Sequence, residues 1–522
     1  MSEPDDIESG DERPSNPENP NASQENTSEE NQGIGVRQKI GFFIGPACLL
    51  FTLVVPTPAA MEPGAWLTLG LALWMALWWI TEAIPVAATA LLPIAVIPLL
   101  DLGTVEDAAH PYASAVIFLF LGGFLIAQAV QRWNLHRRVA LHLIRLIGAQ
   151  PRRVIAGFMV ATAFLSMWIS NTATAVMMLP IGLSLIELVT SHSEEADDPR
   201  TFNFAIALLL GIAYSSSIGG ASTIIGTPPN ALLVGYLDQE FGVEIGFGQW
   251  MLVGVPFTLI MLPVSWLILV RWVFPVRLQE IPGGRELIEE ELTKLGEITR
   301  AEKTVAAVFL LIALAWITRP FVEDFIPGLT DAGIAIIGAI LLFLIPVDPK
   351  RAEFALDWDS ARQIPWRVLV LFGGGLSLAN MITAQGLAAW VGESLTFVGA
   401  LPVIPMLSVV VLSLVIITQL TTNTAAAATF FPILAALALS IGEHPFLLLI
   451  PAAIGASCAF ILPVATPPNA IMYGSGYVKI NNMIRGGFTL NLVFAAAIPL
   501  ITYTALTLIF GVEPGVLPPW AN

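Results

Sequence analysis

Apolar runs long enough to cross a lipid bilayer recur along this chain from Ile40 almost to Phe510. A helix needs roughly 20 residues to cross the hydrocarbon, and fewer when it enters only halfway. Backbone groups in lipid must be satisfied internally, so such runs form helices or barrel strands. Long alternating segments of the barrel type are absent from the sequence. The residues are 56% hydrophobic and 12% charged, against about 25% charged in soluble domains, which predicts an all-α polytopic membrane protein.

Two polar stretches interrupt the apolar runs at matching places. They are Ser170-Asn171-Thr172 and Thr422-Asn423-Thr424. Asn171 and Asn423 lie 423 − 171 = 252 positions apart, and Gly122 and Gly374, each in a run of glycines, show the same offset. Landmarks that recur in the same order indicate an internal duplication.

A second pair of breaks follows the polar stretches. They are Gly226-Thr227-Pro228-Pro229-Asn230 and Ala465-Thr466-Pro467-Pro468-Asn469. Two consecutive prolines remove two backbone donors and stop a helix, so in mid-span they free the carbonyls before them. Structural kinks are the alternative interpretation, although a kink alone does not require the Thr and Asn around it. Matching discontinuities in two repeats are typical of the binding site of a transporter.

The distribution of Lys and Arg predicts the orientation in the membrane. Basic residues occur in the loops at 132–153, 271–303, 347–367 and 479–485. They are absent from the loops at 57–65, 101–112, 238–249, 386–402 and 441–445, and the loop at 319–331 has only Arg319. This division is kept if each polar stretch, with its two apolar arms, enters and leaves on one side. We therefore expect about 11 transmembrane helices and two re-entrant hairpins in two inverted-topology repeats.

This topology divides the chain into four segments. We expect a disordered acidic tail at 1–35, a first span with repeat one at 36–275, a cytoplasmic linker at 276–303, and repeat two at 304–522. Hairpin 152–190 enters from the cytoplasm and hairpin 402–440 from outside. The tail lacks the features of a signal peptide. With the orientation that the Lys and Arg residues indicate, we expect a multi-pass protein of the cytoplasmic (inner) membrane with a cytoplasmic N-terminus.

The hairpin tips have the chemistry of an ion site. A tip that ends one helix and starts another exposes carbonyls on one arm and N–H groups on the other, which suit a cation and an anion respectively. The alternative is that Ser170 and Asn171 only cap the second arm, but the duplication favours a site. Glu187 is the only acidic residue in the two hairpins, which argues against an enzyme and favours Na⁺ over H⁺ as the coupling ion. A passive channel would not need paired discontinuities around one midplane site.

The sequence resembles the divalent anion/sodium symporter family, which includes dicarboxylate, citrate and sulfate carriers. The resemblance runs from about Ile40 to the C-terminus. It rests on Ser170-Asn171-Thr172, on Asn423-Thr424, and on the stretch 457–469, which reads Ser-Cys-Ala-Phe-Ile-Leu-Pro-Val-Ala-Thr-Pro-Pro-Asn. It implies a homodimer in which a scaffold domain holds the dimer and a transport domain moves as an elevator. Substrate would bind between the two tips, with one Na⁺ beside each.

The resemblance also implies particular ligands. The first sodium site would use Ser166, Asn171 and Gly226, and the second Thr418, Asn423 and Ala465. The substrate would contact Ser170, Asn171, Thr172, Thr227, Thr422, Asn423, Thr424 and Thr466. The second motif of the family often begins with Ser, where this chain has Thr422, whose methyl group narrows the pocket.

We therefore expect sodium-coupled secondary active transport of di- or tricarboxylates such as succinate, malate or fumarate, with two or more Na⁺ ions and an elevator mechanism. A dicarboxylate exchanger without net sodium coupling and a sodium/sulfate symporter remain alternatives. The expected partners are a small anionic substrate, sodium ions, the lipid bilayer and a second copy of the chain. Neither nucleic-acid binding nor enzymatic activity is expected.

The topology is testable with single cysteines in a variant that lacks Cys48 and Cys458. Cysteines at positions 137 and 350 should be protected from a membrane-impermeant reagent added outside, because the basic loops face the cytoplasm. Cysteines at positions 244 and 399 should be labelled. External labelling at position 350 would show that one hairpin crosses the membrane completely.

Overall fold

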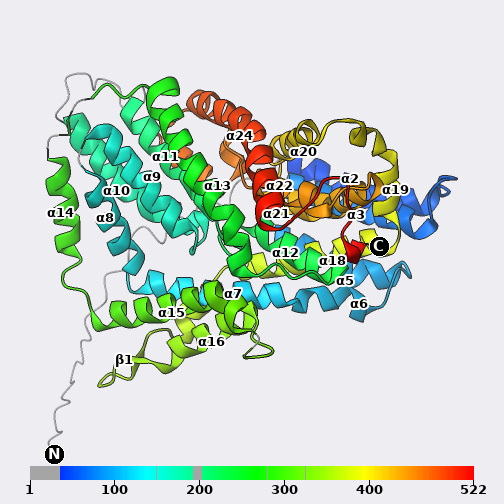
Figure 1. The fold of residues 1–522 in the computed structure, drawn as a ribbon, viewed down its shortest axis with the longest axis horizontal. Coiled ribbons are helices and arrows are strands. Elements are labelled where there is room, and N and C mark those ends of the chain that lie inside the picture. The colour runs from blue at the N-terminus through cyan, green and yellow to red at the C-terminus, as the bar shows by residue number, and fades with distance from the viewer. Residues whose placement is uncertain are drawn as a thin grey trace, which may run out of the picture.

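The computed structural model of the 522-residue chain describes residues 36–521, apart from 149, 192–202, 279, 282 and 324. The tail at 1–35, for which disorder is predicted, lies outside the described residues. The regular secondary structure of the described chain is helical except for one two-stranded antiparallel sheet of β1 (Pro346–Asp348) and β2 (Glu353–Phe354). Figure 1 shows the helices as a thick bundle, with the first described residues in blue and the last in red.

The first half of the chain contains thirteen α-helices in the described residues. They are α2 (Val36–Val54), α3 (Pro63–Thr81), α4 (Val86–Thr89), α5 (Leu92–Leu99), α6 (Val105–Ala109), α7 (Ala115–Arg132), α8 (Leu135–Ile147), α9 (Pro151–Ser166), α10 (Asn171–Ser191), α11 (Asn203–Gly220), α12 (Pro228–Phe241), α13 (Phe247–Leu267) and α14 (Gly284–Lys294). A short π-helical segment, Ile268–Val273, extends α13.

The second half repeats this order. It contains α15 (Arg300–Val322), α16 (Asp331–Leu344), α17 (Trp358–Ala361), α18 (Trp366–Ala384), α19 (Leu387–Ser394), α20 (Val403–Ile417), α21 (Asn423–Ser440), α22 (Pro445–Ala456), α23 (Pro467–Gly474) and α24 (Ile480–Ile509). Helices α9 and α10 correspond to α20 and α21, and α11 and α12 correspond to α22 and α23. The linker predicted at 276–303 contains α14, and the last span begins eight residues earlier than the apolar run at Phe488 indicates.

Ten helices of the described chain are long and apolar enough to cross a membrane, which confirms the prediction of an all-α polytopic membrane protein. Two of the ten are α10 and α21, the second arms of the predicted hairpins. The other eight, with three of the shorter apolar helices, occupy the places of the eleven predicted crossings.

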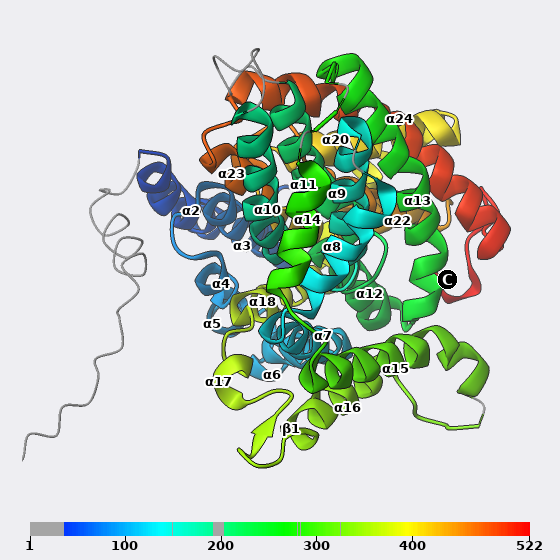
Figure 2. The same ribbon diagram turned by 90° about the vertical axis from the view of Figure 1, so that its left-hand side faces the viewer.

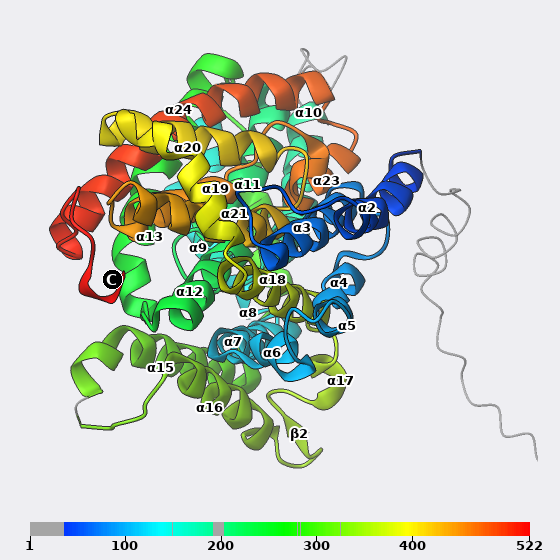
Figure 3. The same cartoon turned by 90° about the vertical axis from the view of Figure 1, so that its right-hand side faces the viewer.

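The two halves pack crosswise around the breaks. Helix α12, from the first half, packs against α21 and α22 of the second, and α23 packs against α10 and α11. Helices α7, α15 and α16 lie together at one edge of the molecule (Figure 2). Helices α3 to α5 lie beside α18 at another edge, and α2 packs on α3 (Figure 3). Each break is therefore surrounded by elements from both halves of the chain.

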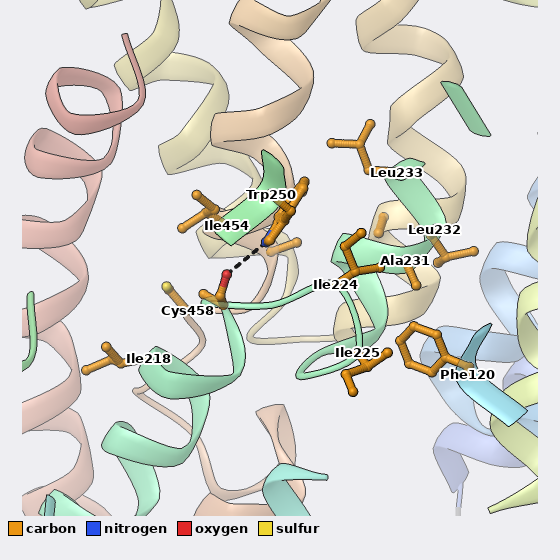
Figure 4. Packing of buried hydrophobic residues seen from close by; sticks show 14 of the residues in the cluster. Phe120, Ile218, Ile224, Ile225, Ala231, Leu232, Leu233, Trp250, Ile454 and Cys458 are labelled. Carbon is orange, nitrogen blue, oxygen red and sulfur yellow. Dashed lines mark hydrogen bonds between the residues drawn. The ribbon is translucent and has the colours of Figure 1, made fainter. Parts of the chain in front are cut away.

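The first break is packed among buried apolar side chains. Figure 4 shows Ile218, from the end of α11, on the side of Cys458, whereas Ile225, from the break, lies beside Phe120 of α7. Helix α11 is apolar along its first turns and almost entirely buried, as expected of a helix that is hydrophobic on all sides. The Trp250 indole donates a hydrogen bond of 3.0 Å to the Ala221 carbonyl. This bond joins the break to helix α13.

The Gly-Gly landmarks are points of close helix contact. A side chain at Gly122 in α7 would place its Cβ 2.6 Å from the backbone carbonyl carbon of Ala335 in α16. Gly373 and Gly374 in α18 pack in the same way against Tyr112 and the backbone of Ala90. Small residues allow helices to approach closely in membranes, where packing rather than hydrophobicity drives their association.

Neighbouring glycines provide a matched test of this packing. Gly122→Ala forces α7 and α16 apart, because the new methyl meets backbone rather than a movable side chain. We expect it to cost about 1–3 kcal/mol, as overpacked cores do. Gly123→Ala should be close to neutral, because its Cβ meets only the Ile225 side chain, at 3.4 Å. Thermal unfolding of the purified variants measures the difference, and equal melting temperatures would contradict the assignment.

Candidate functional site

The first tip is the break between the two arms of the first helix pair. Helix α9 ends at Ser166 and α10 begins at Asn171. The Ser170 hydroxyl accepts a 3.3 Å hydrogen bond from the Ala173 N–H, and the Ser170 carbonyl accepts one of 3.2 Å from the Thr174 hydroxyl. Ser170 therefore does cap α10, as the alternative interpretation held. Ser170, Asn171 and Thr172 are all half-buried.

Asn171 extends into a cluster of oxygen atoms. Its side-chain amide lies 2.5 Å from the Ser166 hydroxyl, 3.0 Å from the Ser216 carbonyl oxygen and 3.2 Å from the Gly226 carbonyl oxygen. With its nitrogen turned inward, the amide donates to all three. With its oxygen turned inward, it accepts from Ser166, and two backbone carbonyl oxygens lie beside it. Neutral oxygens of this kind are ligands that a hard cation takes.

The structure thus brings together Ser166, Asn171 and Gly226, the three residues predicted for the first sodium site. It adds the carbonyl of Ser216, which sequence reasoning missed. The available signal was the run Ser215-Ser216-Ser217 in the otherwise apolar helix α11.

The first Pro-Pro break lies between the end of α11 at Gly220 and the start of α12 at Pro228. Thr223 ties this break to the first tip, because its hydroxyl donates to the Met167 carbonyl and accepts a 3.1 Å hydrogen bond from the Gly226 N–H. The tip and the break therefore form one hydrogen-bonded unit.

Asn230 holds the freed carbonyls of this break. Its side-chain nitrogen lies 2.8 Å from the Thr223 carbonyl oxygen, and 3.3 and 3.4 Å from those of Ala221 and Gly220. Asn469 does the same in the second break, where its nitrogen donates to the carbonyls of Ala459, at 3.0 Å, and Leu462, at 3.1 Å. Both asparagines reach the carbonyls seven and ten residues before them, so the duplication extends to individual hydrogen bonds.

The second tip lies between the end of α20 at Ile417 and Asn423, where α21 begins. The Thr422 hydroxyl accepts a 3.3 Å hydrogen bond from the Ala425 N–H, so Thr422 caps α21 as Ser170 caps α10. Gln419 ties this tip to its break, since its side-chain oxygen accepts a 3.0 Å hydrogen bond from the Ile461 N–H. Sequence reasoning missed Gln419, which carries no motif.

The residues predicted for the second sodium site are less closely joined. Thr418 is fully buried and donates to the Val415 carbonyl at 3.1 Å, and Ala465 ends a short turn at Pro463–Ala465. In the described part of the chain, no hydrogen bond links either residue to Asn423. The side-chain oxygen of Asn423 is instead buried without a hydrogen-bond partner. A buried acceptor without a partner is costly, so this position favours a ligand that the oxygen can bind.

One hydrogen bond crosses between the two breaks. The hydroxyls of Thr227 and Ser457 are 3.2 Å apart, and both residues are buried. Thr227 precedes α12, and Thr466 holds the equivalent place before α23, where its hydroxyl accepts from the Asn469 N–H at 3.4 Å. Thr172 and Thr424 are the second residues of α10 and α21. Every predicted substrate residue therefore lies at the start of a helix.

A cation reaches the second tip from a distant part of the sequence. The Arg37 guanidinium, on α2, donates to the Leu420 carbonyl at 3.0 Å and also to the Ile80 carbonyl. The tips themselves carry no Lys or Arg, and sequence reasoning offered no basis for placing Arg37 beside them.

Taken together, the site is built from hydroxyls, amides, backbone carbonyls and helix starts. No group of three His, Cys, Asp or Glu side chains that could hold a metal occurs in the described ranges. A helical membrane protein with two broken tips and two unwound spans, paired between its halves, is a secondary transporter.

Comparison with known proteins identifies the family of transporters to which the chain belongs. The family described as "Sodium:sulfate symporter transmembrane region" matches residues 38–510, and the chain belongs to that family. It is therefore a transporter rather than an enzyme.

Sequence relatives cover almost the whole chain. The sodium-dependent dicarboxylate transporter SdcS of Staphylococcus aureus strain USA300 is 43% identical over 493 residues, which are 93% of this chain and 94% of the relative. The SdcS protein of strain NCTC 8325 / PS 47 matches to the same extent.

Solved structures show a similar fold. The YdaH transporter of Alcanivorax borkumensis has a TM-score of 0.51 at 13% identity, over 84% of this chain and 98% of that one. MtrF of Neisseria gonorrhoeae has a TM-score of 0.51 at 11% identity, over 95% and 100%.

The asparagine clamps are testable without a transport assay. Asn469→Asp keeps the size of the side chain but removes the N–H donors for the Ala459 and Leu462 carbonyls. We expect it to destabilise the protein by about 1–3 kcal/mol, the cost of buried unsatisfied groups. Asn481→Asp, at an exposed position at the start of α24, is the control. Thermal unfolding compares the two variants. An Asn469→Asp variant with the melting temperature of the wild type would show that the break does not depend on the Asn469 hydrogen bonds.

Proposed function

We propose that this chain is a sodium-coupled symporter that carries C4 dicarboxylates such as succinate, malate and fumarate across the cytoplasmic membrane. The observation that carries the proposal is the oxygen cluster around Asn171, which has a matching position at Asn423 in the other half of the chain. The SdcS relatives, at 43% identity, are named sodium-dependent dicarboxylate transporters, which supports the same substrate class here.

The two cation positions suit Na⁺. The first is formed by Ser166, Asn171 and Gly226 with the Ser216 carbonyl, and the second by Thr418, Asn423 and Ala465. All of these groups are neutral oxygens. A cluster without carboxylates leaves a bound cation with its full positive charge, which is then available to attract an anion nearby.

The substrate lies between the tips in this proposal. One carboxylate meets Ser170, Asn171 and Thr172, and the other meets Thr422, Asn423 and Thr424, each at the positive start of a helix. Thr227 and Thr466 complete the walls. A dianion would be costly to bury among neutral groups alone, so the two Na⁺ ions contribute most of the charge compensation.

The hydrogen bonds at the site support movement of the tips and breaks as one body. Thr223 joins the first tip to its break, Gln419 joins the second tip to its break, and Thr227 joins the two breaks. We propose that this body moves as an elevator against a scaffold containing α7, α15 and α16, in a homodimer with a cytoplasmic N-terminus. Hairpin 152–190 would open to the cytoplasm and hairpin 402–440 to the outside, as two inverted-topology repeats require.

Sulfate is the second candidate substrate, because the description of the matching family names it. Its four oxygens are compact, whereas the two tips present two separate sets of donors. Competition with labelled succinate distinguishes the two anions, and uptake inhibited by sulfate far more strongly than by malate would favour the sulfate carrier.

Removing either tip amide should stop transport. Asn171→Ala or Asn423→Ala deletes a group that contacts both a cation and the substrate, so we expect uptake of labelled succinate into proteoliposomes to fall to background. Expression and the elution volume of the purified protein should stay unchanged. Asn481→Ala is the matched control and should transport normally. Near-normal uptake by either tip variant would reduce the motif to a pair of helix caps.

Substrate affinity should rise steeply with Na⁺, and Na⁺ affinity with substrate by the same factor, because coupling between two binding sites is reciprocal. Binding of succinate is titrated at several Na⁺ concentrations, with K⁺ replacing Na⁺ to hold the ionic strength. Butyrate, a monocarboxylate of the same length, should bind more weakly because one tip remains unmatched. Succinate affinity that stays constant across the series would leave a sodium-independent exchanger as the better interpretation.

A further inference from the structure

An apolar cavity of about 220 Å³ lies beside the first tip, apart from the groups assigned to substrate and Na⁺. Leu165, Trp168 and Ile169 from the end of α9 form one wall, and Ala306 and Phe309 of α15 form another. Residues of α7 and the start of α8 complete it. The wall at the tip ends one residue before Ser170.

The lining of the cavity is apolar apart from His136 and the Trp168 indole, whose N–H is buried without a hydrogen-bond partner. His136 is the one titratable side chain in its lining, and burial holds the pKa of His136 below its ordinary value, which keeps the ring uncharged at neutral pH. Nδ1 of that ring is also engaged by the Val130 carbonyl, at 3.1 Å. Apolar cavities of about 150 Å³ bind small hydrocarbons, and this one is larger.

The cavity connects with the outer apolar surface of the protein. Leu310 and Phe164, which line it, are 64% and 41% exposed. Leu311 and Leu314, on the same helix as Leu310, are exposed as well. In a membrane protein, the part of such a surface that lies outside the proposed dimer interface faces lipid, where the surrounding hydrocarbon consists of acyl chains. A chain end has a continuous apolar path from the bilayer to the cavity.

We infer that this cavity binds the acyl chain of a bilayer lipid. The chain lies between the arm that presents the first tip and the helices α7 and α15. It packs against Trp168, which already contacts Phe309 edge-on at 5.1 Å between ring centroids and stacks on Phe247 at 6.0 Å. The occupant therefore touches the residues that position Ser170 and Asn171 while leaving their polar groups free. This inference goes beyond the proposed function and does not depend on it.

A phosphatidylcholine with a diazirine near the end of one acyl chain tests the inference. The full-length protein is reconstituted in vesicles containing this lipid, irradiated, digested and mapped by mass spectrometry. Leu165 and Ile169 are only 5% and 4% exposed, so a chain that stays on the outer surface cannot reach them. We expect adducts on both residues in addition to those on the exposed residues of α15.

Two neighbouring alanines provide the controls. Ala306→Phe fills the cavity and should abolish the adducts on Leu165 and Ile169. Ala307→Phe points outward from the same helix and should leave them unchanged. If Ala306→Phe does not fold, Ala306→Met adds a flexible side chain at the same place. Adducts confined to exposed residues in the wild type, or unchanged in the filled variant, would overturn the inference. The assay needs neither Na⁺ nor substrate, so its failure leaves the transport proposal standing.

Discussion

Broken helices can exist in the middle of this membrane protein because one buried asparagine at each Pro-Pro break donates hydrogen bonds to the backbone carbonyls that the break frees. A non-helical segment in hydrocarbon leaves carbonyls without partners, each at a cost of several kcal/mol. Asn230 and Asn469 each supply one side-chain nitrogen that reaches backbone carbonyls seven and ten residues earlier. The prolines after Thr227 and Thr466 open the helices, and the asparagines make the openings stable. The groups proposed to bind substrate and cation lie on the two tips and the two Pro-Pro breaks, so they depend on these four segments keeping their shape.

The backbone carbonyls that the breaks free need hydrogen-bond donors, and the same carbonyls can serve as ligands in a binding site. The Gly226 carbonyl faces Asn171, and close approach of the two chain segments is possible only because Gly220 and Gly226 carry no side chains. The two halves are nevertheless not identical in detail. The Thr227 hydroxyl forms a hydrogen bond with Ser457 in the other half of the chain, whereas the Thr466 hydroxyl caps α23. A duplicated chain can thus keep its symmetry in the backbone and lose it in the side chains that face the ligand.

The sequence was informative where local chemistry decides the structure. Pro-Pro pairs, helix-starting Ser and Thr, and interrupted apolar runs predicted both tips and both Pro-Pro breaks. Ser166 and Gly226, beside Asn171, were expected only from the family resemblance. The sequence was uninformative where a residue acts on a distant segment, since nothing local marks Ser216, Gln419 or Arg37. Helix α14 was predicted as part of a linker because its composition is charged, but Glu291 pairs with Arg137 and holds it beside α8. The closeness of Thr418 and Ala465 to Asn423 stays a prediction.

The crosswise packing of the halves has a consequence for how the protein is made. A ribosome delivers the first half to the membrane well before the second, and domains ordinarily begin to fold in that order. Here α12 packs on α21 and α22, and Thr227 bonds to Ser457, so these contacts form only once both halves have been inserted. Until then the first break sits in the bilayer with its polar groups incompletely covered.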